Sequence, residues 1–193
     1  MRLFFAVALP DDIIAAIVAS QAKIRKPAGE DGIRWTRPEQ FHYTLKFLGE
    51  QPPARMTKAT LAAELIRRSV KPFDLVLAGI GAFPNANRPG TIWLGAASGA
   101  ESLAELAGKL DRALHHAGFA LDNRPLTPHL TLARIKSYQG EASAAKALEK
   151  LEIGEVGRAT VDRFVLMQSN TKPTGSEYTV IQEFKLEEGD ERG

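Results

Sequence analysis

Cysteine is missing from this chain of 193 residues. Disulfides, thiolate metal sites and cysteine nucleophiles are therefore excluded. Long hydrophobic runs are missing as well: the apolar stretch after Arg2 stops at Pro10, which is too short for a transmembrane helix, and no convincing signal-peptide cleavage site follows it. We therefore expect a cytoplasmic protein that does not associate with membranes.

An excess of charge of one sign is also missing. Lys and Arg number 25 against 23 Asp and Glu, which gives a formal net charge of +2. This mild basicity argues against a protein that coats nucleic acid, so a polyanionic ligand would need a local basic cleft. The rest of the composition, with 44% hydrophobic and 25% charged residues, is ordinary for a globular protein.

Helix and strand patterns are mixed along the chain without strict alternation. Apolar spacing predicts helices over residues 12–25, 54–68, 101–117 and 141–150, and strands over residues 2–9, 33–36, 41–48, 73–83, 91–96, 129–135, 155–168 and 177–186. Neighbouring strands at 73–83 and 91–96, and again at the end of the chain, indicate hairpins. The sequence therefore predicts an α+β fold with mainly antiparallel sheet.

One short pattern, His-x-Thr-Leu, occurs twice, and each copy lies on a predicted strand. The first copy begins at His42 and the second at His129, far along the chain. Residues i and i+2 of a strand point to the same side, so His42 projects with Thr44 and His129 with Thr131. If the two strands face each other across a cleft, two imidazoles and two hydroxyls converge there.

These four side chains suit chemistry at a phosphate ester. Imidazole titrates near neutral pH, so one histidine can act as a base and the other as an acid. Threonine hydroxyls can donate hydrogen bonds to anionic oxygens. A single His-x-Thr on a strand would indicate only a structural role, because Thr is common in strands; the repeat favours function.

The paired motifs resemble those of the 2H phosphoesterase superfamily, and within it those of the bacterial and archaeal RNA 2′,3′-cyclic phosphodiesterases, also called 2′-5′ RNA ligases. The resemblance spans nearly the whole chain. Further segments that carry it are Arg2–Ala6, Arg34–Glu39, Lys46–Glu50, Phe83–Asn85, Arg88–Pro89, Trp93–Gly95, Ala133–Arg134 and Tyr178–Val180.

The resemblance implies a bilobal fold with two mainly antiparallel sheets around a central cleft, helices on the outside and pseudo-twofold symmetry. Each lobe would contribute one central motif strand to the cleft. We expect residues 1–186 to form this single domain, residues 187–193 to form a polar tail, and the protein to be a monomer.

The resemblance also implies hydrolysis of RNA 2′,3′-cyclic phosphate ends to 2′-phosphomonoesters, without metal or other cofactor. His42 and His129 would be catalytic, and Thr44 and Thr131 would hold the nonbridging oxygens. The resemblance favours His129 as base and His42 as acid, a polarity that the sequence leaves open. Reversal of the reaction would give 2′-5′ RNA ligation.

Three alternatives stay open. The chain could be a catalytically silent module that binds RNA ends, or a phosphodiesterase for other cyclic or 2′-5′-linked nucleotides. A metal site that bridges the lobes through the two histidines is a third alternative, although the sequence contains no His-x-His and no His-Glu-x-x-His pattern.

Arg134 is the best cationic candidate for binding substrate, because it matches the family motif and a guanidinium suits a phosphate. Its position has the opposite strand parity from His129, so a regular strand would point it away from the cleft. Direct contact requires a bulge or a strand end, and a structural ion pair is the alternative.

Strict alternation along 41–48 makes two further predictions. Tyr43 would pack in the core together with Phe47 and the apolar residues between them. Lys46 shares the parity of His42 and would line the cleft or extend into solvent.

Overall fold

Helices and strands follow one another in the mixed order that the sequence predicts. The computed structural model describes residues 1–172 and 175–187. The elements are β1 (Arg2–Ala8), α1 (Asp11–Ala28), β2 (Ile33–Trp35), the short 3₁₀ helix η1 (Pro38–Gln40), β3 (His42–Glu50), α2 (Pro53–Ile66), β4 (Phe73–Asn85), β5 (Arg88–Ser98), α3 (Ala100–His116), β6 (Leu130–Ile135), α4 (Tyr138–Glu149), β7 (Glu155–Val161), β8 (Arg163–Lys172) and β9 (Gly175–Lys185). Most of the predicted tail, residues 188–193, lies outside the described residues.

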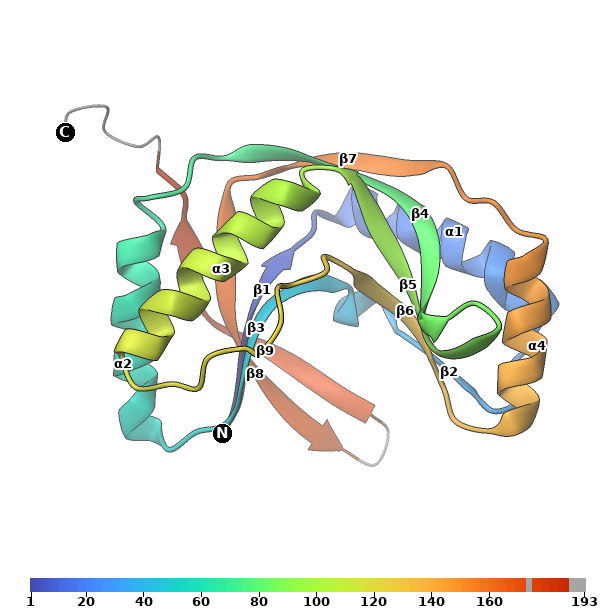
Figure 1. Ribbon diagram of the computed structural model, residues 1–193, viewed down its shortest axis with the longest axis horizontal. Helices are drawn as coiled ribbons and strands as arrows, with labels where there is room; N and C mark the ends of the chain where they lie inside the picture. The colour runs from blue at the N-terminus through green and yellow to red at the C-terminus, as the bar shows by residue number, and fades with distance from the viewer. Residues whose placement is uncertain (173–174, 188–193) are drawn as a thin grey trace.

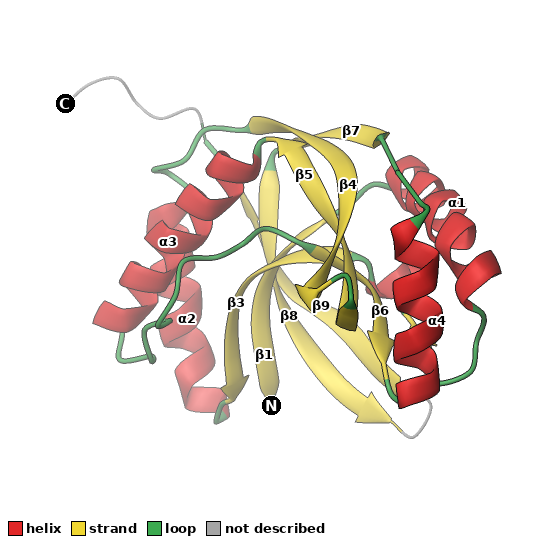
Figure 2. Ribbon diagram, turned by 45° about the vertical axis from the view of Figure 1, so that its right-hand side comes forward, coloured by secondary structure: helices red, strands yellow, loops and turns green. Residues whose placement is uncertain are grey.

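The strands form two antiparallel sheets. The first sheet has the order β3-β1-β8-β9 and the second the order β2-β6-β5-β4-β7. Helices α2 and α3 pack together beside the first sheet, and α1 and α4 pack together at the other end of the molecule (Figures 1 and 2). The predicted α+β fold, with two antiparallel sheets and outer helices, is confirmed.

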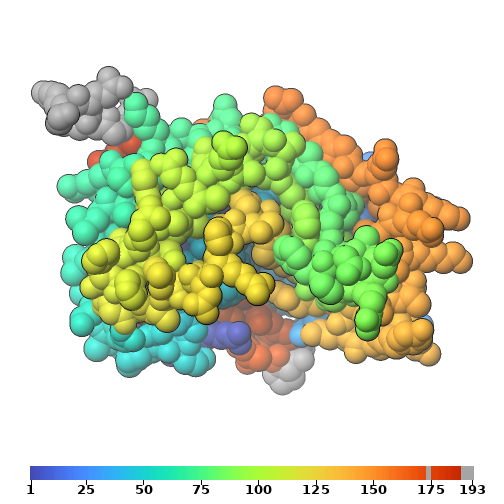
Figure 3. Space-filling model, viewed as in Figure 1, coloured from blue at the N-terminus to red at the C-terminus, as the bar shows by residue number. Residues whose placement is uncertain are grey.

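The surface of one face is recessed between the two ends. In the space-filling view, the recess separates the yellow segment that leads into β6 from the green hairpin of β4 and β5 (Figure 3). Within residues 1–172 and 175–187, none of the helices combines the length and the apolar character that crossing a bilayer requires.

Two expectations about the strands are wrong. Residues 155–168 form not one strand but β7, which pairs with β4 in the second sheet, and β8, which pairs with β1 in the first. The chain changes sheet at Asp162, a step that local apolar spacing cannot reveal. The first motif strand, β3, lies at the edge of its sheet and is not central, whereas β6 lies between β2 and β5.

Strand β1 is buried on both faces, which explains its continuous apolar run. Leu3, Phe5 and Val7 join the main core that both sheets and the helices share. Phe4 and Ala6 face the other way and join a smaller apolar cluster. This second cluster forms the support beneath the first histidine motif.

Both motif strands carry a β-bulge at the leucine of the motif. In β3, the register against β1 passes from Thr44 to Lys46 and leaves Leu45 without a partner. In β6, the register against β5 passes from Thr131 to Ala133 and leaves Leu132 without one. An extra residue reverses the alternation of the side chains beyond it.

The bulge at Leu45 overturns two predictions. Lys46 is only 3% exposed, so it neither lines the cleft nor extends into solvent. Phe47, expected in the core, is 60% exposed on the same side as His42. Tyr43 precedes the bulge, and its predicted core position is confirmed: it is buried, and its hydroxyl donates a hydrogen bond to the carbonyl of Gly95 at 2.9 Å.

The buried ammonium of Lys46 holds the segment between α3 and β6. Its Nζ donates to the carbonyl of Ala120 at 2.8 Å and forms ion pairs with Asp111 at 2.5 Å and Asp122 at 2.7 Å. The backbone N–H of Asp122 in turn donates to the Asp111 carboxylate. Because this segment leads to His129, Lys46 connects the strand of one histidine to the approach of the other.

We expect Lys46→Met to lower the free energy of unfolding by about 3 kcal/mol, because removal of the buried ammonium leaves the partly buried Asp111 carboxylate without its counter-charge. Urea unfolding measures the change. Lys58→Met is the matched control, since Lys58 is exposed on α2. Equal stability of the two variants would contradict the role given to the buried ammonium.

Candidate active site

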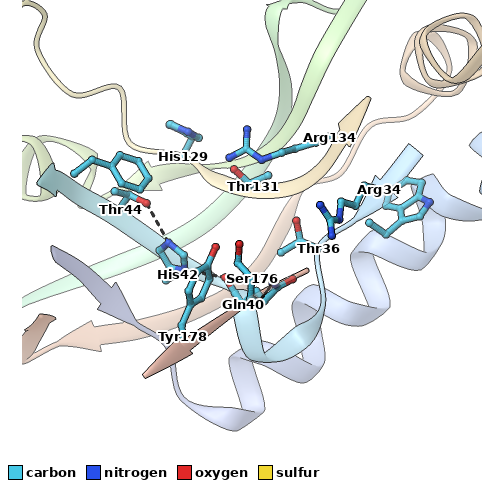
Figure 4. Close-up of a pocket in the computed structure, with 12 residues that line it drawn as sticks. Arg34, Thr36, Gln40, His42, Thr44, His129, Thr131, Arg134, Ser176 and Tyr178 are labelled. Carbon is cyan, nitrogen blue, oxygen red and sulfur yellow. Dashed lines mark hydrogen bonds between the residues drawn. The ribbon is translucent and has the colours of Figure 1, made fainter. Parts of the chain in front are cut away.

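One pocket brings together all five side chains that the sequence singles out. The lining residues are Arg34, Trp35, Thr36, Gln40, His42, Thr44, Phe47, His129, Thr131, Arg134, Ser176 and Tyr178 (Figure 4). The two copies of the motif therefore meet in space.

The two histidines are anchored in the same way. The Nδ1 atom of His42 lies 2.8 Å from the carbonyl oxygen of Gln40, and Nδ1 of His129 lies 2.8 Å from that of Thr127. In both motifs the carbonyl belongs to the residue two positions earlier. A carbonyl can only accept, so Nδ1–H donates in both rings, and in the neutral form of each imidazole Nε2 carries the lone pair.

A hydroxyl from the same strand contacts the free nitrogen of the first histidine. The Nε2 atom of His42 lies 3.1 Å from Oγ1 of Thr44 (Figure 4). This contact follows from the i, i+2 spacing within the motif, since both residues precede the bulge. The neutral imidazole accepts a hydrogen bond here, and an incoming ligand can compete for either group.

Aromatic rings hold both imidazoles. His42 forms a three-ring cluster with Phe4 and Tyr178, with ring centroids 5.0 Å and 5.3 Å away, and Tyr178 meets it edge-on at 83°. His129 meets Phe83 edge-on, with centroids 5.0 Å apart. These contacts fix the rings and remove water from one side of each. The aromatic partners come from β1, β9 and β4, so both sheets contribute.

Burial lowers the pKa of His42 to about 4. The hydrogen bond to the carbonyl of Gln40 opposes this shift, while electrostatic interaction with His129 and Arg134 lowers the pKa further. Without a ligand, His42 is therefore neutral at physiological pH. The same interactions place these three groups near each other in the pocket.

Arg134 points into the pocket because of the bulge at Leu132. The reversed alternation puts it on the side of Thr131, which removes the objection from strand parity (Figure 4). The alternative of a structural ion pair is not found: within residues 1–172 and 175–187, Arg134 has no carboxylate partner.

Several lining residues were not assigned to the site from the sequence. Arg34 comes from β2, where it lies directly opposite Arg134. Phe47 reaches the pocket through the bulge at Leu45. The remaining additions are Trp35, Thr36, Gln40, Ser176 and Tyr178. Alternation between buried Ile33 and Trp35 points Arg34 outward, but no local signal predicts that β2 pairs with β6.

The charge of the pocket is positive. Its described lining residues include two arginines and no carboxylate. Such a site attracts an anion and stabilises negative charge on it. In the same described part of the chain, no three His, Cys, Asp or Glu side chains cluster closely enough to hold a metal ion.

A comparison with known protein families matches the two halves of the chain separately, and each half contains one histidine motif. A family model described as LigT like Phosphoesterase matches residues 7–93 and again residues 94–178, so each match contains one histidine motif. An RNA 2′,3′-cyclic phosphodiesterase of Methanocaldococcus jannaschii is 33% identical over 184 residues, which cover 95% of this chain and 100% of that protein. One of Thermus thermophilus is 34% identical over 195 residues, 96% of this chain and 90% of its own length.

Solved structures agree in fold. A crystal structure of a Thermus thermophilus protein matches with a TM-score of 0.79 and 32% identity, covering 96% of this chain and 98% of that one. The crystal structure of Escherichia coli LigT complexed with 3′-AMP matches with a TM-score of 0.76 and 29% identity, over 96% and 97% of the two chains.

We expect His42 to remain neutral, with its proton on Nδ1, when the ligand-free protein is brought to pH 5.5, because its pKa lies at about 4. Long-range proton–nitrogen NMR spectra of the imidazoles measure this, and His42→Gln assigns the signal. Arg134→Gln should raise the pKa, since it removes one of the charges that lower it. A midpoint near the ordinary value of about 6.5 would contradict the environment described.

The same shift links pH to stability. An unfolded His42 takes up its proton near pH 6.5, whereas the folded one does so only near pH 4. The free energy of unfolding should therefore fall as the pH falls through this window, and His42→Gln should lose that part of the pH dependence.

Proposed function

The chain belongs to the LigT-like phosphoesterase family, and we propose that it hydrolyses RNA 2′,3′-cyclic phosphate ends to 2′-phosphomonoesters with His42 and His129 as the acid–base pair. The observation that carries the proposal is the matched anchoring of both histidines through Nδ1 in one positively charged pocket. This arrangement leaves two Nε2 atoms available to a single ligand.

The remaining predicted residues suit the phosphate itself. Thr44 and Thr131 offer hydroxyls to the nonbridging oxygens. Arg134 offers a planar guanidinium, which can donate two parallel hydrogen bonds to a phosphate. Donors that are already in place where negative charge increases lower the barrier of the reaction.

The proposed reaction needs one proton removed and one supplied. His129, neutral, takes a proton from the attacking water, and His42 gives a proton to the departing 3′-oxygen of the ribose. A 2′-phosphate results. The same ring opening, with the 5′-hydroxyl of a second RNA end attacking in place of water and the 3′-oxygen leaving, gives 2′-5′ ligation.

The low pKa of His42 sets a condition on these roles. An acid has to carry its proton when the substrate is bound, and His42 lacks it in the ligand-free pocket. A bound phosphate anion places negative charge beside His42 and offsets the repulsion from Arg134, so it raises the pKa. Substrate binding and protonation of His42 are therefore linked.

Saturation with 2′-AMP should raise the pKa of His42 above its ligand-free value of about 4. NMR titration of the imidazole, with and without the nucleotide, measures the change. A His42 that stays neutral in the complex at pH 5.5 would reverse the roles and make His42 the base.

Replacement of either catalytic histidine tests the function directly. We expect His42→Ala and His129→Ala each to lower kcat/KM for a cyclic-phosphate oligonucleotide by about 10²–10⁴-fold, since each removes one acid–base group. The assay contains a chelator, and the product is identified as a 2′- or 3′-monophosphate. His116→Ala is the control, because His116 is exposed on α3 and does not line the pocket.

The outcomes also separate the alternatives. Affinity for the oligonucleotide without turnover would identify a silent binding module. Turnover only of other cyclic or 2′-5′-linked nucleotides would change the substrate, and turnover that needs added metal would refute the metal-free mechanism. Near-full activity of both histidine variants would overturn the catalytic assignment.

A further inference from the structure

We propose that Arg34 binds a second phosphate of the substrate, the phosphodiester that joins the terminal nucleotide to the one before it. This inference rests on the proposed function and extends it. Arg34 would then favour the end of an RNA chain over a cyclic mononucleotide.

The pairing of two arginines carries the inference. Arg34 in β2 lies directly opposite Arg134 in β6, and both side chains are exposed in the pocket. Like charges directly opposite each other destabilise a pair of strands. Among the described residues neither arginine has a carboxylate partner, so nothing in this part of the protein offsets the repulsion. Bound anions would.

One phosphate does not account for both arginines. A cyclic phosphate between His42 and His129 carries a single negative charge and engages Arg134, whose charge already acts on His42. Arg34 lies at the opposite end of the pocket from Thr44, beyond Arg134 (Figure 4). The second guanidinium is therefore placed for an anion other than the reacting one.

The protein makes room for the Arg34 guanidinium. A Cβ atom at position 175 would lie 3.0 Å from Nη2 of Arg34, and Gly175 has none. The hydroxyls of Thr36 and Ser176 line the same part of the pocket (Figure 4). A guanidinium beside hydroxyls matches a phosphodiester and the ribose next to it.

Chain connectivity favours a phosphodiester as the second anion. When the terminal cyclic phosphate occupies the histidine end, the rest of the RNA leaves the pocket in one direction. The next group of negative charge on that strand is the preceding phosphodiester. A cyclic mononucleotide has no such group and cannot use Arg34 in this way.

The test compares three substrates: 2′,3′-cyclic AMP, a diadenosine ending in a 2′,3′-cyclic phosphate, and the same dinucleotide with a neutral methylphosphonate at the internal linkage. We expect Arg34→Gln to lower kcat/KM for the charged dinucleotide by about 10- to 100-fold, the range for a hydrogen bond to a charged group. The loss on the mononucleotide should be much smaller, because Arg34 contributes only its distant charge to the binding of that substrate. For the wild-type protein, the neutral linkage should lower kcat/KM by a similar factor relative to the charged dinucleotide. For Arg34→Gln, the neutral linkage should cause no further decrease.

Arg112→Gln is the matched control, because it removes an equal charge from an exposed position of α3. Three results would each overturn the inference. In the first, Arg34→Gln lowers kcat/KM equally for the mononucleotide and the dinucleotide; in the second, it lowers neither value. In the third, the neutral linkage slows Arg34→Gln as much as it slows the wild-type protein. Failure of the wild-type protein to cleave any of the substrates would instead refute the proposed function. Isothermal titration calorimetry tests the role of Arg34 without turnover. It compares the affinity for the 2′-phosphorylated dinucleotide with the affinity for 2′-AMP.

Discussion

The β-bulges at Leu45 and Leu132 decide which side chains the two motif strands present to the pocket. Before each bulge, regular alternation puts His and Thr on one side. Beyond it, the alternation is reversed, so the fourth residue after the histidine turns inward and the fifth turns to the pocket. Without the extra residue, Lys46 would face the cleft, and both Phe47 and Arg134 would turn away from it.

The same local geometry produces two different halves of one site. Phe47 and Arg134 occupy equivalent places in the two motifs, each five residues after its histidine. One offers an aromatic face and the other a cation. A nucleotide end has a flat base and an anionic phosphate, so two copies of the motif that differ at this position can serve both parts of one ligand.

The pocket would be more strongly repulsive if His42 carried a positive charge beside the two arginines. His42 avoids this repulsion by remaining neutral. With two arginines and no described carboxylate in the lining, protonation of His42 is unfavourable until an anion binds. Lys46, by contrast, lies beneath the surface and forms ion pairs with Asp111 and Asp122. Burial of an unpaired cation is therefore avoided in two different ways. His42 gives up its proton, and Lys46 pairs with carboxylates.

The α+β class, most of the helices and strands, and the His-x-Thr pairs can be predicted from the amino-acid sequence, because these depend on residue type and spacing within one segment. The sequence also indicated that Arg134 needed a bulge to reach a ligand. The folded chain was needed to show that both bulges exist, that Lys46 is buried, that residues 155–168 divide between two sheets, and that Arg34 faces Arg134. Register and sheet membership depend on the partner strand, which lies elsewhere in the chain, so no local periodicity could have determined them.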